Sequence, residues 1–106
     1  MDIWTSLGAF AFFESERLSF RPLIFLDRFD LHEIVSNPKN LQFFFPATQT
    51  QHETDCLLVH YFMKEPLGVW AIVDKELDKM IGVVRFEKID VQKRTAELGY
   101  FLNASY

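Results

Sequence analysis

The sequence contains one cysteine, Cys56, among its 106 residues. A single cysteine cannot form an internal disulfide, so nothing in the cysteine usage points to an oxidising compartment, and we take the cytoplasm as the expected location. The three histidines, His32, His52 and His60, lie far apart in the sequence and form no cluster with the spacing of metal ligands. We therefore expect no bound metal.

Positive charge is also scarce. Eleven Lys and Arg residues stand against fifteen Asp and Glu residues, which gives a formal net charge of −4. Phosphate contacts dominate nucleic-acid affinity, so an acidic chain without a basic cluster is not expected to bind nucleic acid. No apolar run approaches the roughly 20 residues that span a bilayer. The apolar leader, residues 1–13, has no basic residue before its hydrophobic part, unlike a secretory signal.

Hydrophobic residues, in contrast, make up 49% of the chain, and twelve of them are Phe. This composition predicts one domain with an aromatic-rich core, near the common domain size. The leader is too apolar for a free tail. We expect it to pack on the domain or on a second copy of the chain, and a short helix is one form it could take there.

Two helices are predicted in the first half. Asp27 is placed to cap a helix over residues 27–35, and Asp30 adds negative charge to its first turn. Thr50 and Glu53 have the spacing of a capping box for a second helix, which should run to about Lys64. The residues expected to face the core are Phe29, Leu31, Ile34 and Val35 in the first helix, and Leu57, Leu58, Tyr61 and Phe62 in the second.

Strands are predicted at residues 16–22, 69–73, 80–89 and 95–102, where apolar and β-branched residues lie between short polar turns. Gly82, inside the third of these, indicates a bulge or a close backbone approach. The last three strands form an antiparallel meander. The order of elements predicts an α+β fold in which an antiparallel sheet packs against two helices.

Four segments resemble the amino-terminal part of the GNAT acetyltransferases, and in particular the ribosomal-protein alanine acetyltransferases of the RimJ/RimL type. They read ESERLSFRP at residues 14–22, GVWAIV at 68–73, MIGVV at 80–84 and AELGYFL at 96–102. The resemblance therefore covers residues 14–106 as the N-terminal portion of a GNAT domain. It implies acetyl transfer from acetyl-CoA, a co-substrate, to a primary amine, either a protein N-terminus or a small molecule.

The family's Gly-rich loop, which binds the acetyl-CoA pyrophosphate at a helix N-terminus, has no counterpart here. The four glycines, Gly8, Gly68, Gly82 and Gly99, are too far apart to form it. We therefore expect that this segment alone is not catalytically competent. The alternative interpretation is a non-catalytic GNAT-like domain for binding or self-association. Such a domain would form a homodimer through the exposed last strand or the leader.

The resemblance places Glu97 beside the acetyl group, where a carboxylate could accept the proton of the amine. The competing interpretation is a structural ion pair with Arg17, Arg85 or Arg94. Backbone amides of the next segment are the candidates for binding the thioester and the pantetheine arm, and a bulge is expected at Gly99 because Gly tolerates unusual dihedral angles. These candidate cofactor-binding residues are Gly99, Tyr100, Phe101 and Leu102.

We also expect a pocket for the acceptor amine. Its candidate residues are Phe44, Phe45, Trp70 and Phe86, and the competing interpretation is that these residues belong to the ordinary hydrophobic core. The Tyr100 side chain is expected to be packed. The identity of the acceptor amine does not follow from the sequence.

Overall fold

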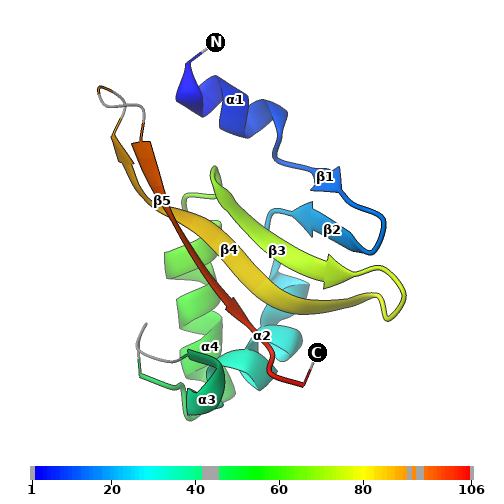
Figure 1. The fold of residues 1–106 in the computed structure, drawn as a ribbon. Coiled ribbons are helices and arrows are strands. Elements are labelled where there is room, and N and C mark those ends of the chain that lie inside the picture. Colours follow the sequence, from blue (N-terminus) through cyan, green and yellow to red (C-terminus); the bar gives the residue numbers. More distant parts are fainter. Residues whose placement is uncertain (1, 42–45, 91, 93–94, 106) are drawn as a thin grey trace.

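A computed structural model describes residues 2–41, 46–90, 92 and 95–105, and Figure 1 shows its architecture. The sheet has the order β1-β2-β3-β4-β5, and every neighbouring pair is antiparallel. Helices α2 and α4 lie on one side of this sheet (Figure 1). The α+β class predicted from the sequence is therefore confirmed. The strands are β1 (Phe13–Glu14), β2 (Leu18–Arg21), β3 (Val69–Asp74), β4 (Lys79–Asp90) and β5 (Thr95–Leu102).

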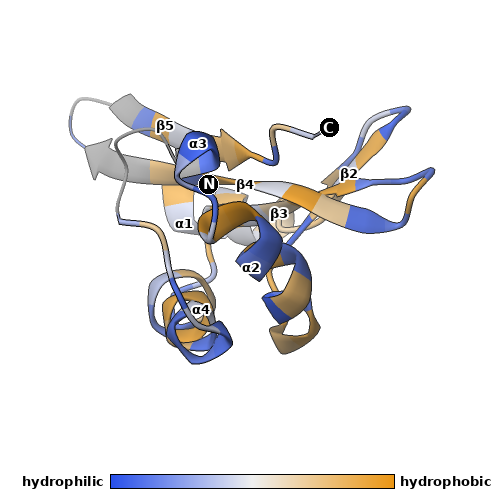
Figure 2. Cartoon of the chain, turned by 90° about the horizontal axis from the view of Figure 1, so that it is seen from below, coloured by the Kyte–Doolittle hydropathy of each residue, from blue (hydrophilic) through white to orange (hydrophobic). Residues whose placement is uncertain are grey.

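The first helix, α1, spans Ile3–Ala9, and the helical layer of the domain follows β2. The elements of that layer are η1 (Phe25–Asp27), α2 (Arg28–Val35), α3 (Pro38–Leu41), α4 (Gln51–Leu57) and the π-helix η2 (Leu58–Met63). Figure 2 shows α2 and α4 side by side below the sheet, each with apolar and polar residues. Their buried side chains meet alternate residues of the strands, including Val69, Ala71 and Val73 of β3.

The predicted core positions Leu31, Ile34 and Val35 are fully buried, whereas the prediction for Phe29 is wrong because that side chain is 61% exposed. The Arg28 guanidinium lies 4.9 Å from the centre of the Phe29 ring. Arg28 also donates to both oxygens of Asp55 in α4. These hydrogen bonds hold the pKa of Asp55 at about 2, so the link between the two helices is ionised at neutral pH.

Asp27 does not cap α2, contrary to the prediction. The residue ends the 3₁₀ turn η1 and has helical backbone angles, so its carboxylate points elsewhere. It accepts the Ile24 N–H at 2.8 Å and forms a two-pronged ion pair with Arg21, with N–O distances of 2.8 and 2.7 Å. Only 4% of Asp27 is exposed. This ion pair ties the end of β2 to the start of the helical layer.

The capping box of the second helix is present in a slightly different form. The Thr50 hydroxyl accepts the Glu53 N–H at 3.1 Å, and the Glu53 carboxylate accepts the N–H of Gln49. The helix continues as a π-helix from residue 58, so its wider turn changes which side chains face the sheet. Leu58 and Phe62 are fully buried, but Tyr61 is 45% exposed, which corrects the prediction for that residue.

The leader packs on the domain as a helix followed by a short strand. Asp2 caps α1 by accepting the Thr5 N–H at 2.9 Å. The Phe13 ring stacks on Phe20 of β2 with a centroid distance of 4.5 Å. Behind α1, the indole N–H of Trp70 donates to the Phe10 carbonyl at 3.2 Å. Thus the leader covers the part of the sheet that lies opposite the helical layer.

Gly82 lies in β4 at a position where the backbone of β5 leaves no room for a side chain. The register with β3 shifts between Ile72 and Val73, which leaves an extra residue on β4 beside Gly82. A Cβ at Gly82 would lie 2.6 Å from the Phe101 carbonyl oxygen and 2.5 Å from a Leu102 methyl. The predicted bulge and close backbone approach are both present.

Candidate active site

Strand β5 is the outermost strand of the described sheet, and β4 is its hydrogen-bonded neighbour. The Asn103 N–H donates to the Ile81 carbonyl at 2.7 Å, so the backbone of Asn103 faces β4. Successive residues of a strand direct their backbone groups to opposite sides. The N–H and C=O groups of Gly99 and Phe101 therefore face β4, whereas those of Tyr100 and Leu102 face the outer edge.

The side chains of β5 divide in the same alternating way. Gly99, Phe101 and Asn103 are buried on the face that meets the helices. On the opposite face Tyr100 is 58% exposed, and Leu98 and Leu102 are exposed with it. The prediction of a packed Tyr100 side chain is therefore wrong, because no described element covers this residue.

The bulge expected at Gly99 lies on the neighbouring strand instead. Gly99 pairs with Arg85 and Leu98 with Phe86, but the next pair joins Glu97 to Lys88. Residue 87 is thus the extra one, on β4 rather than on β5. The shift occurs directly beside Glu97, whose side chain is exposed. Three arginines were predicted as alternative partners of Glu97. Arg17 precedes β2, which β3 and β4 separate from β5, Arg85 stacks on Tyr61, and Arg94 lies outside the described residues.

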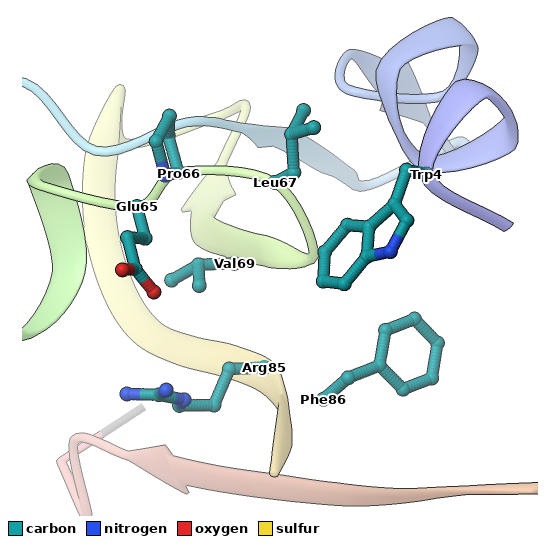
Figure 3. Close-up of a pocket in the computed structure, with 7 residues that line it drawn as sticks. All are labelled: Trp4, Glu65, Pro66, Leu67, Val69, Arg85 and Phe86. Atoms are coloured by element: carbon teal, nitrogen blue, oxygen red, sulfur yellow. The ribbon is translucent and has the colours of Figure 1, made fainter. Parts of the chain in front are cut away.

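A cavity of about 500 Å3 opens between the chain before β3, the middle of β4 and helix α1. Figure 3 shows the side chains that line it: Trp4, Glu65, Pro66, Leu67, Val69, Arg85 and Phe86. Phe86, predicted as a pocket residue, lies in its wall. The lining therefore combines aromatic and aliphatic groups with one acid and one guanidinium, which suits a ligand that has both apolar and charged parts.

Trp70 does not line this cavity. It lies beneath α1, is 7% exposed and contacts Phe13 and Phe86 edge to face. It borders a second, apolar cavity of about 480 Å3 between α1 and the sheet. The interpretation of Trp70 as core fits this position. Phe44 and Phe45, which were also predicted as pocket residues, lie outside the residues that the structure describes.

Neither Trp4 nor Glu65 was predicted from the sequence as a pocket residue, and Arg85 was predicted only as a possible ion-pair partner of Glu97. One signal for Arg85 was present, because it is a charged residue within the apolar run of β4. For Trp4 and Glu65 there was none, since they meet Arg85 only after the leader and the end of η2 have folded against β4.

The described residues contain no group of three or more His, Cys, Asp or Glu side chains that could hold a metal ion. Among the helices in this part of the chain, none is long and apolar enough to cross a membrane.

Comparison with known proteins identifies the class to which this fold and site belong. The family described as the acetyltransferase (GNAT) domain matches residues 17–106. The chain therefore belongs to the GNAT acetyltransferase family. Comparison with curated protein sequences finds no match.

Solved structures have the same fold. A GNAT-family acetyltransferase from Bacillus anthracis has a TM-score of 0.72 and 21% identity, covering 90% of this chain and 55% of that one. The ribosomal-protein-S5-alanine acetyltransferase from Vibrio fischeri has a TM-score of 0.59 and 21% identity, with 90% and 57% covered. RimL, a ribosomal L7/L12 α-N-protein acetyltransferase solved with coenzyme A, has a TM-score of 0.62 and 27% identity, with 87% and 55% covered. The chain thus spans about half the length of these proteins.

Proposed function

We propose that the complete protein transfers an acetyl group from acetyl-CoA to a primary amine, as a cytoplasmic enzyme similar to the RimJ/RimL type. The observation that supports this most strongly is the outer edge of β5, where the N–H and C=O groups of Tyr100 and Leu102 face away from β4. An amide-containing arm such as pantetheine can bond to a strand edge as another strand would. The arm would run from Glu97 toward Asn103.

In the proposed mechanism the amine attacks the thioester carbonyl directly, in a ternary complex. A new N–C bond forms while the C–S bond breaks, and the thiolate leaves as the thiol after taking up a proton. Glu97 accepts the proton of the amine through a water molecule, because its side chain is exposed. Edge amides of β5 near Tyr100 stabilise the negative charge that develops on the carbonyl oxygen.

The experiment is acetylation of peptides with a free N-terminus by the complete protein and acetyl-CoA, followed by mass spectrometry. We expect a product that is one acetyl group heavier, and fragmentation that places this group on the α-amine. Omitting the protein, or blocking the peptide amine beforehand, is the control. If no amine of a broad peptide and small-molecule set is acetylated, catalytic acetyl transfer is excluded.

In that case the second candidate function, non-catalytic binding or self-association, takes its place. Leu98, Tyr100 and Leu102 form an exposed apolar row along the outermost described strand, and such an edge recruits partners. A molecular mass that rises with protein concentration would then be the positive evidence, and a constant monomeric mass would count against it.

A further inference from the structure

The cavity of Figure 3 has two chemically different ends. Trp4, Leu67 and Phe86 form an apolar end, whereas Glu65 and Arg85 approach from the other. No ion pair within 4.0 Å joins these two charged side chains in the described part of the chain, so the same cavity contains a carboxylate and a guanidinium that are not directly paired. Such a wall complements a ligand that has both an ammonium and a carboxylate group.

Arg85 is held in place but is incompletely paired. Its guanidinium lies 4.4 Å from the centre of the Tyr61 ring, and its Nη1 donates to the Tyr61 carbonyl at 3.3 Å. Its Nε is buried, and no atom of the described residues accepts its hydrogen. A guanidinium has five N–H donors, and burial of an unmatched one is costly.

Two other arginines, which are paired with carboxylates, provide a comparison. Arg21 and Arg28 each bind a carboxylate of this chain through two nitrogens, Asp27 and Asp55 respectively. Arg85 has the same fork of donors, but among the described residues its guanidinium donates to a peptide carbonyl and stacks on an aromatic face, and it has no carboxylate partner there. Because Tyr61 already fixes the guanidinium, little conformational entropy would be lost when it binds a carboxylate.

The position of Arg85 relates this cavity to the proposed acetyl site. Gly99 lies directly across from Arg85 in the β4–β5 pair, and adjacent strands are roughly 4.8 Å apart. Gly99 has no side chain that could block the way from the guanidinium to β5. A ligand whose carboxylate is at Arg85 would therefore have its amine, a few bonds away, close to the strand that we propose to hold the acetyl group.

We infer that Arg85 binds a carboxylate of the acceptor, so that the preferred substrates are amines with a carboxylate only a few bonds from the reacting nitrogen. This inference rests on the proposed function. Two sources have this chemistry: a free α-amino acid, and a protein N-terminus with an acidic side chain beside its first residue. Glu65 attracts the ammonium form of the same acceptor, and the apolar end of the cavity binds its hydrocarbon part.

The test compares acceptors that differ only in the carboxylate. One arm uses two tetrapeptides with aspartate or asparagine at the second position, and the other uses serine and serinamide. Each is assayed for kcat and KM with the complete protein and with Arg85→Gln, Arg85→Lys and Arg17→Gln. Arg17 is exposed and directly precedes β2, which β3 separates from β4, so its variant removes the same charge without touching the cavity.

We expect wild-type protein to prefer the carboxylate acceptor of one arm by about 10-fold in kcat/KM, mainly through KM, as for a charged hydrogen bond. A preference within the tetrapeptide pair identifies a protein N-terminus as the acceptor, and a preference for serine over serinamide identifies a free α-amino acid. Arg85→Gln should abolish the preference, because it should lower kcat/KM for the carboxylate acceptor by about 10-fold more than for its neutral counterpart. Arg85→Lys should keep part of the preference, because its charge remains, and Arg17→Gln should keep all of it.

Two outcomes overturn the inference: wild-type protein that shows no preference in either arm, or an Arg85→Gln variant that loses both reactions of a pair equally. Calorimetry distinguishes failure of this inference from failure of the proposed function. If no acceptor is acetylated, the affinities of the same acceptor pairs still decide the role of Arg85. Tighter binding of the carboxylate member that is lost in Arg85→Gln supports it, and equal binding excludes it.

Discussion

Glu97→Gln is expected to lower kcat of the complete protein by at least about 100-fold, the effect typical of removing a positioned general base. The amide has the size of the carboxylate but cannot accept the proton that the amine must lose. Because Glu97 has an exposed side chain beside the register shift of β4 and β5, the change should leave the sheet intact. Steady-state kinetics measures kcat, and calorimetry measures the affinity for acetyl-CoA, which we expect to be unchanged.

A control variant separates this role of Glu97 from the loss of any exposed carboxylate. Glu76→Gln is the matched control, because Glu76 is an exposed acid in the turn between β3 and β4. A Glu97→Gln enzyme that turns over within about 2-fold of wild type would remove the catalytic assignment and leave a structural role.

The second large effect concerns Gly82. Gly82→Ala would place a methyl group 2.6 Å from the Phe101 carbonyl oxygen, and a backbone atom cannot move aside as a flexible side chain can. We expect the free energy of unfolding to fall by about 1–3 kcal/mol, as for other overpacked sites. Since the displaced residues belong to β5, acetyl-CoA affinity should fall as well. Urea unfolding and calorimetry measure these two effects.

Gly8→Ala is the control for this prediction. A Cβ at Gly8 meets no atom within 4 Å, and Gly8 lies in helix α1, where Ala is favoured over Gly by up to about 1 kcal/mol. Unchanged or slightly raised stability is expected for Gly8→Ala. Wild-type stability in Gly82→Ala would show that β4 and β5 can separate without cost, contrary to the close approach described above.

Much of the fold follows from local sequence. Strands β3, β4 and β5 have nearly the predicted bounds, because their apolar runs end at short polar turns and alternate as half-buried strands do. The buried positions of α2 follow from its helical period. The missed features depend on partners far away in the sequence or on local irregularity. Asp27 pairs with Arg21 rather than capping α2, and a π-helix turns Tyr61 away from the core.

The candidate site was predicted in part, and for a similar reason. The resemblance to GNAT acetyltransferases indicated β5 as the binding strand, but the sequence of one strand does not show which of its amides face the adjacent strand. Pairing with β4 shows that Tyr100 and Leu102, rather than Gly99 and Phe101, present backbone groups to the outer edge. The cavity brings together Trp4, Glu65 and Arg85, which are widely separated along the chain. No motif links these three residues, so only the folded chain identifies them.

Amide hydrogen exchange of the complete protein, with and without acetyl-CoA, tests the claim that acetyl-CoA binds at the outer edge of β5. The prediction is that acetyl-CoA slows exchange at the Tyr100 and Leu102 amides, while the Gly99 and Phe101 amides, which already face β4, change little. Exchange at Tyr100 and Leu102 that stays the same at saturating acetyl-CoA would contradict the claim.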